Sequence, residues 1–499
     1  MKRTSAGSLA DACRRAVAAG LLLGLAATVL RMAWRSRGWP LVHDAPIMHY
    51  VAWRIGEGAA PYRDLFDMNF PGTYLLHLAV VRLLGPGDAA WRGFDLAWLA
   101  AGAVAVAAFA APWGRAAAGG GALFFAAHHL AGGAGQAGQR DFLLCPFLLL
   151  GALGVARWLE QRRASSLAWG GLVLGAGVTI KPHAALLAGT LAVVIALGAW
   201  RSGSGVPVAA FGGATALAPL AVVAWIAAVG ALPAWRSIVF EYLLPLYSQL
   251  ARPEYWGFHR WHVWIPIALA VGASLTSALV SRRFGARHGV AVLGLVYGVA
   301  HYVGQGKGWE YHIYPAAAFA AVLLFCELEA LLRARRPVAA IALAACLLAT
   351  VVMLDTKAAE AAGSAETGWI ARKARRVVAL ATDLRARLAP GDLVQVLDTT
   401  GGGIHALLRL HARQPTRFLY DFHFFHDADA PVIRALRDEL VRGLDARPPR
   451  FVVFFREGWP AGGDERIAAF PELATRLDRG FRLDTRGDGY VIYAKRDDP

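Results

Sequence analysis

Long apolar runs dominate this chain of 499 residues and constrain its fold more than any other feature. An α-helix needs about 20 mostly apolar residues to cross a hydrocarbon layer about 30 Å thick. Eleven such stretches occur, and they predict a mostly helical membrane protein with about eleven transmembrane helices. Only 17% of the residues are charged, against about 25% in a soluble chain. The stretches begin near Ala16, Trp91, Ala116, Phe142, Ser166, Ala184, Val206, His262, Gly289, Tyr314 and Val338.

The formal charge of +16 does not indicate nucleic-acid binding, because the basic residues occur in short clusters between apolar runs. Cytoplasmic loops of membrane proteins have this pattern. The four cysteines match no metal or redox spacing and are interpreted as small apolar residues in or near the spans. The amino terminus lacks a convincing cleavage site, so we expect a retained first helix.

A shorter apolar segment at residues 72–85 decides the topology, because every later loop changes sides if it spans the membrane. His77 and Arg82 interrupt it. If it lies along the outer surface, the basic loops at Arg115, 157–163, Arg201, 281–289 and 333–337 all fall on one side. Short loops rich in Lys and Arg are cytoplasmic. We therefore predict an interfacial helix here, with the loop of Asp44, the turns of Asp141 and Lys181, residues 233–261 and 304–312, and the tail on the opposite side.

The tail changes character after the last apolar run. Runs of β type, GDLVQVLDT, RFLYDF, RFVVFF and GYVIYAK, alternate with helical stretches such as IHALLRLHARQ and APVIRALRDELVRGL. This alternation predicts a small α/β domain outside the membrane. The expected division is a transmembrane domain at residues 1–357 and the α/β domain at 358–499. The run TTGGGIHALL lacks the ending of a phosphate-binding loop and is interpreted as a helix start.

Several ionisable residues gather on the predicted outer face. Asp44 and Asp141 lie at or near helix ends, Lys181 and Lys307 lie near the interface, and His43, His183 and His312 lie beside them. Ionisable groups at membrane boundaries are functional candidates because their desolvation is costly. Two other interpretations stay open: each lysine could be a lipid-headgroup anchor, and Asp44 could cap the helix that starts at Pro46.

The order of these motifs resembles a known family. HDAP, then GEGAAPYRDLFDMNFPGTYLLHL, AWRGFDLAWLAAG, QRDFLLCPFLLLGALGVARWL and GGLVLGAGVTIKPHAAL are similar to membrane glycosyltransferases of the GT-C superfamily. The branch that contains the bacterial protein O-mannosyltransferases and the aminoarabinose transferase of lipid A is the most similar. The resemblance covers roughly the first 200 residues and weakens toward Leu354.

The resemblance implies roles for individual residues. Asp44 would be the first-loop catalytic carboxylate, Asp141 the acidic residue after the third span, Arg92 the arginine that opens the second span and Lys181 the lysine that closes the fifth. Donor phosphate would be held by Lys181, Lys307 and Arg92, with Arg140 and His312. We expect no required metal. A divalent ion bound by Asp44 with Asp141 or His43 is the alternative.

The predicted activity is transfer of a hexosyl or pentosyl group from a polyprenyl-phosphate donor to an acceptor hydroxyl, with inversion and with Asp44 as general base. The acceptor would be a glycan, a lipid or a protein. The predicted location is the bacterial inner membrane, with the active site and the tail in the periplasm. A transporter or flippase of lipid-linked sugars is the alternative, although transporters usually bind substrate near the middle of the membrane.

Overall fold

The computed structural model describes residues 4–200, 203–250, 261–333, 350, 368–459 and 462–496. The chain forms two compact units. Unit 1 comprises Met1–Trp39, Trp91–Ala221 and Pro253–Ala365, and unit 2 comprises Pro40–Ala90, Val222–Arg252 and Glu366–Pro499.

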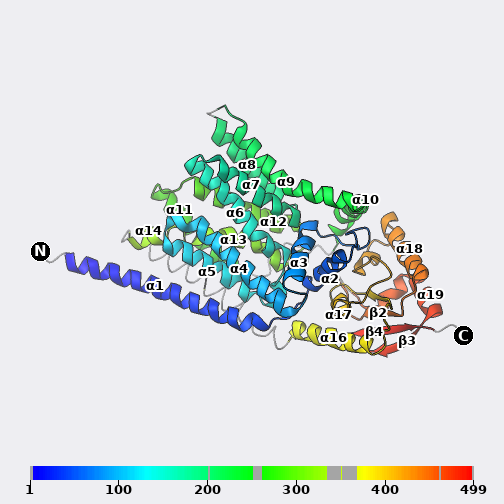
Figure 1. The fold of residues 1–499 in the computed structure, drawn as a ribbon. Coiled ribbons are helices and arrows are strands. Elements are labelled where there is room, and N and C mark those ends of the chain that lie inside the picture. The colour runs from blue at the N-terminus through cyan, green and yellow to red at the C-terminus, as the bar shows by residue number, and fades with distance from the viewer. Residues whose placement is uncertain are drawn as a thin grey trace. The chain divides into compact units, whose positions relative to one another are not determined.

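Unit 1 is helical throughout its described residues (Figure 1). Helices α4 and α9 each run across a boundary between the units, α4 at its start and α9 at its end. The helices are α1 (Thr4–Arg35), α4 (Asp88–Ala110), α5 (Arg115–Ala131), α6 (Arg140–Gln161), α7 (Ala164–Ile180), α8 (Ala184–Ala199), α9 (Val206–Ala228), α11 (Trp261–Val280), α12 (Ala286–Gln305), α13 (Tyr314–Leu324) and α14 (Leu328–Arg333), with short turns η1 (Ser36–Gly38), η2 (Ala111–Trp113), η3 (Ala134–Gln136) and η6 (Glu310–Ile313).

Ten of the eleven predicted apolar stretches correspond to helices among the described residues, and the one beginning near Val338 lies outside them. By length and composition, six described segments can cross a membrane, and α7 and α8 are shorter apolar helices. Helices α5 and α12 are helical as predicted but are not among these segments. Their sequences contain histidine and arginine residues. The six segments are Ala18–Gly38, Asp88–Trp113, Arg140–Gln161, Val206–Ala228, Val263–Val280 and Glu310–Ala330.

Short connections give unit 1 two distinct ends. The Asp141 end contains the starts of α4, α6 and α13 and the ends of α5, α7 and α12, because polar side chains from these termini contact one another there. The Arg287 end contains the opposite termini. There Arg287 of α12 binds Glu160 at the end of α6 and the carbonyl of Phe109 at the end of α4.

The basic loops predicted to be cytoplasmic follow this division wherever the structure describes them. The loop 157–163 joins α6 to α7, and 281–289 joins α11 to α12. Both lie at the Arg287 end, where Arg283 also binds the buried Glu327. Arg201 and residues 334–337 lie outside the described residues. The sorting of charge between the helix ends thus agrees with the predicted topology, and the assignment of sides remains a prediction.

Unit 2 combines three separate stretches of chain. Its helices are α2 (Ala45–Gly56), α3 (Pro71–Leu83), α10 (Leu232–Ser237), the π-helix η5 (Ile238–Tyr247), α16 (Gly368–Arg385), α17 (Gly403–Leu410), α18 (Pro431–Ala446) and α19 (Pro471–Gly480), with 3-10 turns η7 (Phe422–Phe424) and η8 (Asp464–Ala469). Helix α3 coincides with the predicted interfacial segment and packs on α2. Its 13 residues reach about 20 Å, too short to cross about 30 Å of hydrocarbon.

A four-stranded mixed sheet confirms strands in the tail. The order is β1-β2-β4-β3, with β1 (Val394–Leu397) parallel to β2 (Phe451–Phe455), and β4 (Tyr490–Lys495) antiparallel to both β2 and β3 (Phe481–Arg486). Strands β1 and β2 are buried along their whole length. Strand β2 is a continuous apolar run, and the buried Gln395 of β1 is hydrogen-bonded to Gln414 and Thr416. Helix α17 follows β1, and α16 packs on α17.

The predicted run RFLYDF is wrong as a strand of this sheet. Phe418 makes one isolated bridge, to Phe66, and the chain then turns into η7. The sheet contains β3 in place of the predicted run. The sequence of β3, FRLDTR, was not predicted as a strand, and it is mostly exposed. The predicted boundary at residue 357 lies outside the described residues and stays a prediction.

Candidate active site

Asp141, at the start of α6, is the centre of a buried polar cluster in unit 1. Its Oδ2 lies 2.8 Å from Nζ of Lys181, and its Oδ1 lies 2.6 Å from Nε2 of His301. The side chain of Asp141 is 0% exposed and that of Lys181 is 10% exposed. Lys181 ends α7 and His301 lies near the end of α12, so three helices contribute one group each. Both carboxylate oxygens therefore have a partner, which a buried charge requires.

Further polar side chains surround this cluster. Nε2 of Gln305 lies 3.0 Å from Nε2 of His301. The ring of His183 has its centroid 5.3 Å from that of His301, and the ring of His312 lies 6.4 Å from it. Arg140 is close enough to His312 to interact with it electrostatically. We name these residues, with Asp141 and Lys181, the Asp141 cluster.

A second buried network lies at the same end of unit 1. Arg92 of α4 donates to the carboxylate of Asp95 one turn later, and its Nε donates to the carbonyl of Ser36 at 3.0 Å. The same carboxylate lies 3.0 Å from Nε2 of His129, whose Nδ1 lies 2.8 Å from the hydroxyl of Tyr314. Arg92 is 2% exposed. This buried guanidinium is paired with Asp95 and with the carbonyl of Ser36.

Phe142 joins the two networks. Its ring stacks on His129 with centroids 3.8 Å apart and lies 5.5 Å from the ring of Tyr314. Phe142 directly follows Asp141 in the chain, so the start of α6 contacts both networks. Packing of this aromatic ring fixes the position of the Asp141 backbone relative to α5 and α13.

The structure thus brings together five residues predicted from the sequence: Asp141, Lys181, Arg140, His183 and His312. Arg92 belongs to the adjacent network. Lys307 lies in the turn between α12 and η6 and is 9% exposed. The roles of these residues in phosphate binding stay predictions.

Asp44 belongs to unit 2, where it immediately precedes α2. Its backbone carbonyl accepts hydrogen bonds from Ile47 and Met48, but its side chain makes no hydrogen bond to the described first turn of that helix. Its Oδ1 instead lies 3.0 Å from Nδ1 of His43, and the Asp44 side chain is 15% exposed. The carboxylate is therefore not used for side-chain capping, the alternative considered for it.

The backbone conformation of His43 sets the direction of its side chain toward Asp44. His43 adopts a φ of 62°, a left-handed conformation that is uncommon for a residue other than glycine. Its ring meets Trp369 of α16 edge to face, with centroids 5.8 Å apart. The strained conformation and the ring contact hold His43 against Asp44. Asp44 and Asp141 lie in different units, and their joint role in one site stays a prediction.

The described residues contain no group of three or more His, Cys, Asp or Glu side chains arranged to hold a metal ion. The predicted independence from metal, and its alternative, a divalent ion on Asp44 with Asp141 or His43, both stay open to experiment.

Sequence reasoning missed several residues of these networks, among them Asp95, His301, Gln305, His129 and Tyr314. Local spacing carried a signal for the first three. Asp95 follows Arg92 by three residues, and Gln305 follows His301 by four, so each pair shares one helix face. The partners His129 and Tyr314 are distant in sequence, and no local pattern connects them to Arg92.

Comparison of the sequence with known protein families and with curated proteins finds no match. Solved structures do match. ArnT from Cupriavidus metallidurans bound to undecaprenyl phosphate superposes with a TM-score of 0.62 at 14% identity, over 95% of this chain and 98% of that one. The Archaeoglobus fulgidus oligosaccharyltransferase in the apo form gives 0.54 at 12% identity, over 95% of this chain and 74% of that one.

The oligosaccharyltransferase AglB from the same archaeon, in complex with an inhibitory peptide and a dolichol-phosphate, gives a TM-score of 0.51 at 13% identity over 97% of this chain and 75% of that one. At these identities the similarity establishes the fold. The resemblance predicted from the sequence is confirmed at that level: this chain has the fold of the GT-C membrane glycosyltransferases.

Proposed function

We propose that this protein is a membrane glycosyltransferase that moves a sugar from a polyprenyl-phosphate donor to an acceptor hydroxyl. The observation that carries the proposal is the shared fold over 95% of the chain with ArnT, a structure that holds undecaprenyl phosphate. AglB, with the same fold, holds a dolichol-phosphate. A lipid-linked phosphate is thus the ligand that this architecture accommodates in both.

In the proposed reaction Asp44 acts as general base. Its carboxylate takes the proton of the acceptor hydroxyl as that oxygen forms a bond to the anomeric carbon of the sugar. The bond from the anomeric carbon to the phosphate oxygen breaks at the same time, and the polyprenyl phosphate leaves with the electron pair. Attack from the face opposite the leaving group inverts the anomeric centre. General-base catalysis of this kind contributes about 10²–10⁴-fold.

The Asp141 cluster supplies the charge that the leaving phosphate needs. An ammonium has three N–H donors, so Lys181 can bind Asp141 and still donate to a phosphate oxygen. Asp141 then positions Lys181, with Arg140 and His312 beside it. The reaction takes place on the periplasmic face of a bacterial inner membrane, as the sorting of basic loops supports, and it needs no metal ion.

The position of the charges favours an enzyme over a transporter. Transporters bind substrate near the middle of the membrane, between repeats. In this chain Asp141, Lys181 and His301 lie at helix termini, at one end of unit 1. Such a cluster suits a reaction on a headgroup at the membrane surface.

The proposal is tested with purified full-length protein in lipid nanodiscs, radiolabelled polyprenyl-phosphate sugars and a membrane extract as acceptor. Wild type transfers label from at least one donor, and Asp44→Asn lowers the rate by about 10²–10⁴-fold. The Asp44 side chain makes no capping hydrogen bond to α2, so we expect that helix to stay folded in the variant. Asp429→Asn, which changes an exposed carboxylate of unit 2, is the matched control and keeps the wild-type rate.

Two results contradict the proposal. Equal transfer by wild type and Asp44→Asn removes Asp44 from the chemistry. No turnover of any polyprenyl-phosphate sugar by wild type refutes the glycosyltransferase itself.

A further inference from the structure

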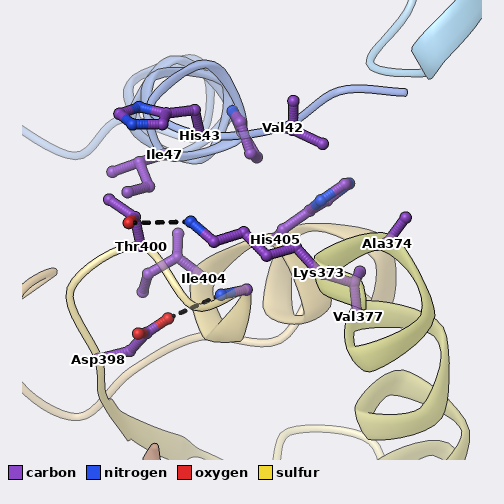
Figure 2. A pocket seen from close by; sticks show the side chains of 12 residues that line it. Val42, His43, Ile47, Lys373, Ala374, Val377, Asp398, Thr400, Ile404 and His405 are labelled. Carbon is purple, nitrogen blue, oxygen red and sulfur yellow. Dashed lines mark hydrogen bonds between the residues drawn. The ribbon is translucent and has the colours of Figure 1, made fainter. Parts of the chain in front are cut away.

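A small hollow in unit 2 adjoins the His43–Asp44 pair and is lined by side chains that the proposed reaction does not use (Figure 2). The start of α2, the first turns of α16 and the loop between β1 and α17 form it. The hollow is small and is partly open to solvent. Its polar lining consists of His43, Lys373, Asp398, Thr400 and His405.

Lys373 is the cation of this hollow. Its Nζ donates to Oγ1 of Thr400 at 3.2 Å, drawn as a dashed line in Figure 2, and lies 4.8 Å from the centroid of the Trp369 ring. Burial lowers the pKa of Lys373, while the charges of Asp398 and Asp44 raise it. The Lys373 side chain is half-buried, and its charge interacts with that of Asp44.

His405 is a buried histidine without a hydrogen bond, ion pair or ring contact to the described residues. It is 7% exposed, lies on α17 and lines the hollow. Burial lowers the pKa of His405 to about 3, with the charge of Arg409 adding to the effect, so its ring is neutral at neutral pH. Its ring lines the hollow, where a ring N–H can donate a hydrogen bond to a ligand.

The backbone N–H groups of the loop 401–403, which lies beside these residues, already have a hydrogen-bond partner within the chain. The carboxylate of Asp398 accepts the backbone N–H groups of Gly401 at 2.7 Å and of Gly402 and Gly403 at 2.9 Å each. The amino terminus of α17 is therefore capped by the chain's own carboxylate. Recognition in the hollow depends on side-chain donors.

We propose that this hollow is an acceptor subsite, which binds an anionic group of the acceptor, a phosphate or a carboxylate, through Lys373, Thr400 and His405. This inference rests on the proposed function. Because His43 lines the hollow and contacts Asp44, an anion held there places its own molecule next to the general base. The apolar walls, which include Val42, Ile47 and Ile404, suit the carbon skeleton that connects the anionic group to the reacting hydroxyl.

Binding is tested without turnover, by the reactivity of Lys373. Full-length protein in nanodiscs is acetylated with an amine-reactive reagent, and modified peptides are quantified by mass spectrometry. Inorganic phosphate or acetate, compared with chloride at equal ionic strength, slows acetylation of Lys373 at least threefold. Lys495 of β4 is the internal control and keeps its rate. His405→Phe weakens the protection while leaving Lys373 in place.

Kinetics then assign the anion to the acceptor or to the donor. Lys373→Met raises the acceptor KM at least about tenfold, as the loss of a charge-assisted hydrogen bond predicts, and leaves the donor KM unchanged. Lys373→Arg restores part of the loss. Arg375→Met removes an exposed charge from the same helix and is the matched control, with both KM values unchanged.

The outcomes separate the subsite from the activity. Transfer by wild type with no protection of Lys373 and an unchanged acceptor KM refutes the subsite alone. A rise confined to the donor KM reassigns Lys373 to the donor phosphate and also refutes it. Protection of Lys373 without turnover of any donor refutes the glycosyltransferase and, with it, the acceptor role of the anion site.

Discussion

At the scale of single residues, the ion pair between Asp141 and Lys181 combines stability with proposed function. Its two side chains are 0% and 10% exposed. Removing one partner leaves the other charge buried without compensation, which typically costs about 3–5 kcal/mol. Removing both leaves no such charge. Stability and activity should therefore respond differently to single and double substitution.

We expect Asp141→Asn to destabilise unit 1 by about 3–5 kcal/mol, and the double variant Asp141→Asn with Lys181→Met to recover most of that loss. Thermal unfolding in a fixed detergent measures both. The double variant stays inactive, because Lys181 is proposed to hold the leaving phosphate. A double variant that regains transfer together with stability would show that the pair is structural only.

At the scale of elements, α6 and α7 approach so closely that glycine is required at their contact. A Cβ on Gly154 would lie 2.5 Å from the carbonyl oxygen of Ser166 and 2.8 Å from Cα of Gly170. Small residues allow such contacts between membrane helices. This packing also sets the distance between Asp141 and Lys181, because the first lies on α6 and the second ends α7.

We expect Gly154→Ala to lower the unfolding temperature and the transfer rate together, since the added methyl group forces α6 and α7 apart. Gly212→Ala on α9, where a Cβ meets no atom within 4 Å, is the control and changes neither. Thermal unfolding and the transfer assay measure the two effects. Equal behaviour of the two variants would mean that the helices tolerate separation.

At the scale of the whole molecule, the composition of unit 2 bears on topology. It gathers Pro40–Ala90, Val222–Arg252 and Glu366–Pro499. These stretches contain the first loop, most of the described part of the 233–261 loop and the tail, which the distribution of basic residues assigns to one side of the membrane. Segments on opposite sides of a bilayer cannot form one compact unit, so the grouping supports that assignment.

We expect a membrane-impermeant maleimide to label Ala89→Cys and Asp429→Cys in cells with a permeable outer membrane and an intact inner membrane. Ser204→Cys should react only after the inner membrane is opened. All three positions are exposed. The parent chain, whose Cys145 and Cys326 are buried, gives the background. Protection of Ala89→Cys together with labelling of Ser204→Cys before the inner membrane is opened would place the helix at residues 72–85 across the membrane.

The sequence by itself determined the helical membrane class, the approximate position of each described apolar helix and a C-terminal domain containing strands. These features are local, because the length of an apolar segment, the distribution of Lys and Arg among loops and the order of motifs can all be read from consecutive residues. The exposed strand β3 escaped prediction because its sequence lacks a continuous apolar run, and pairing with β4 stabilises it.

Only the tertiary structure decided which polar groups meet. Asp141, Lys181 and His301 come from three helices and are separated by up to 160 residues, and Lys373 reaches the neighbourhood of Asp44 from α16. Such contacts depend on how helices pack, and packing is set by side-chain shape across elements, which no local pattern records. The same holds for Asp44, whose side chain could have capped α2 and instead contacts His43.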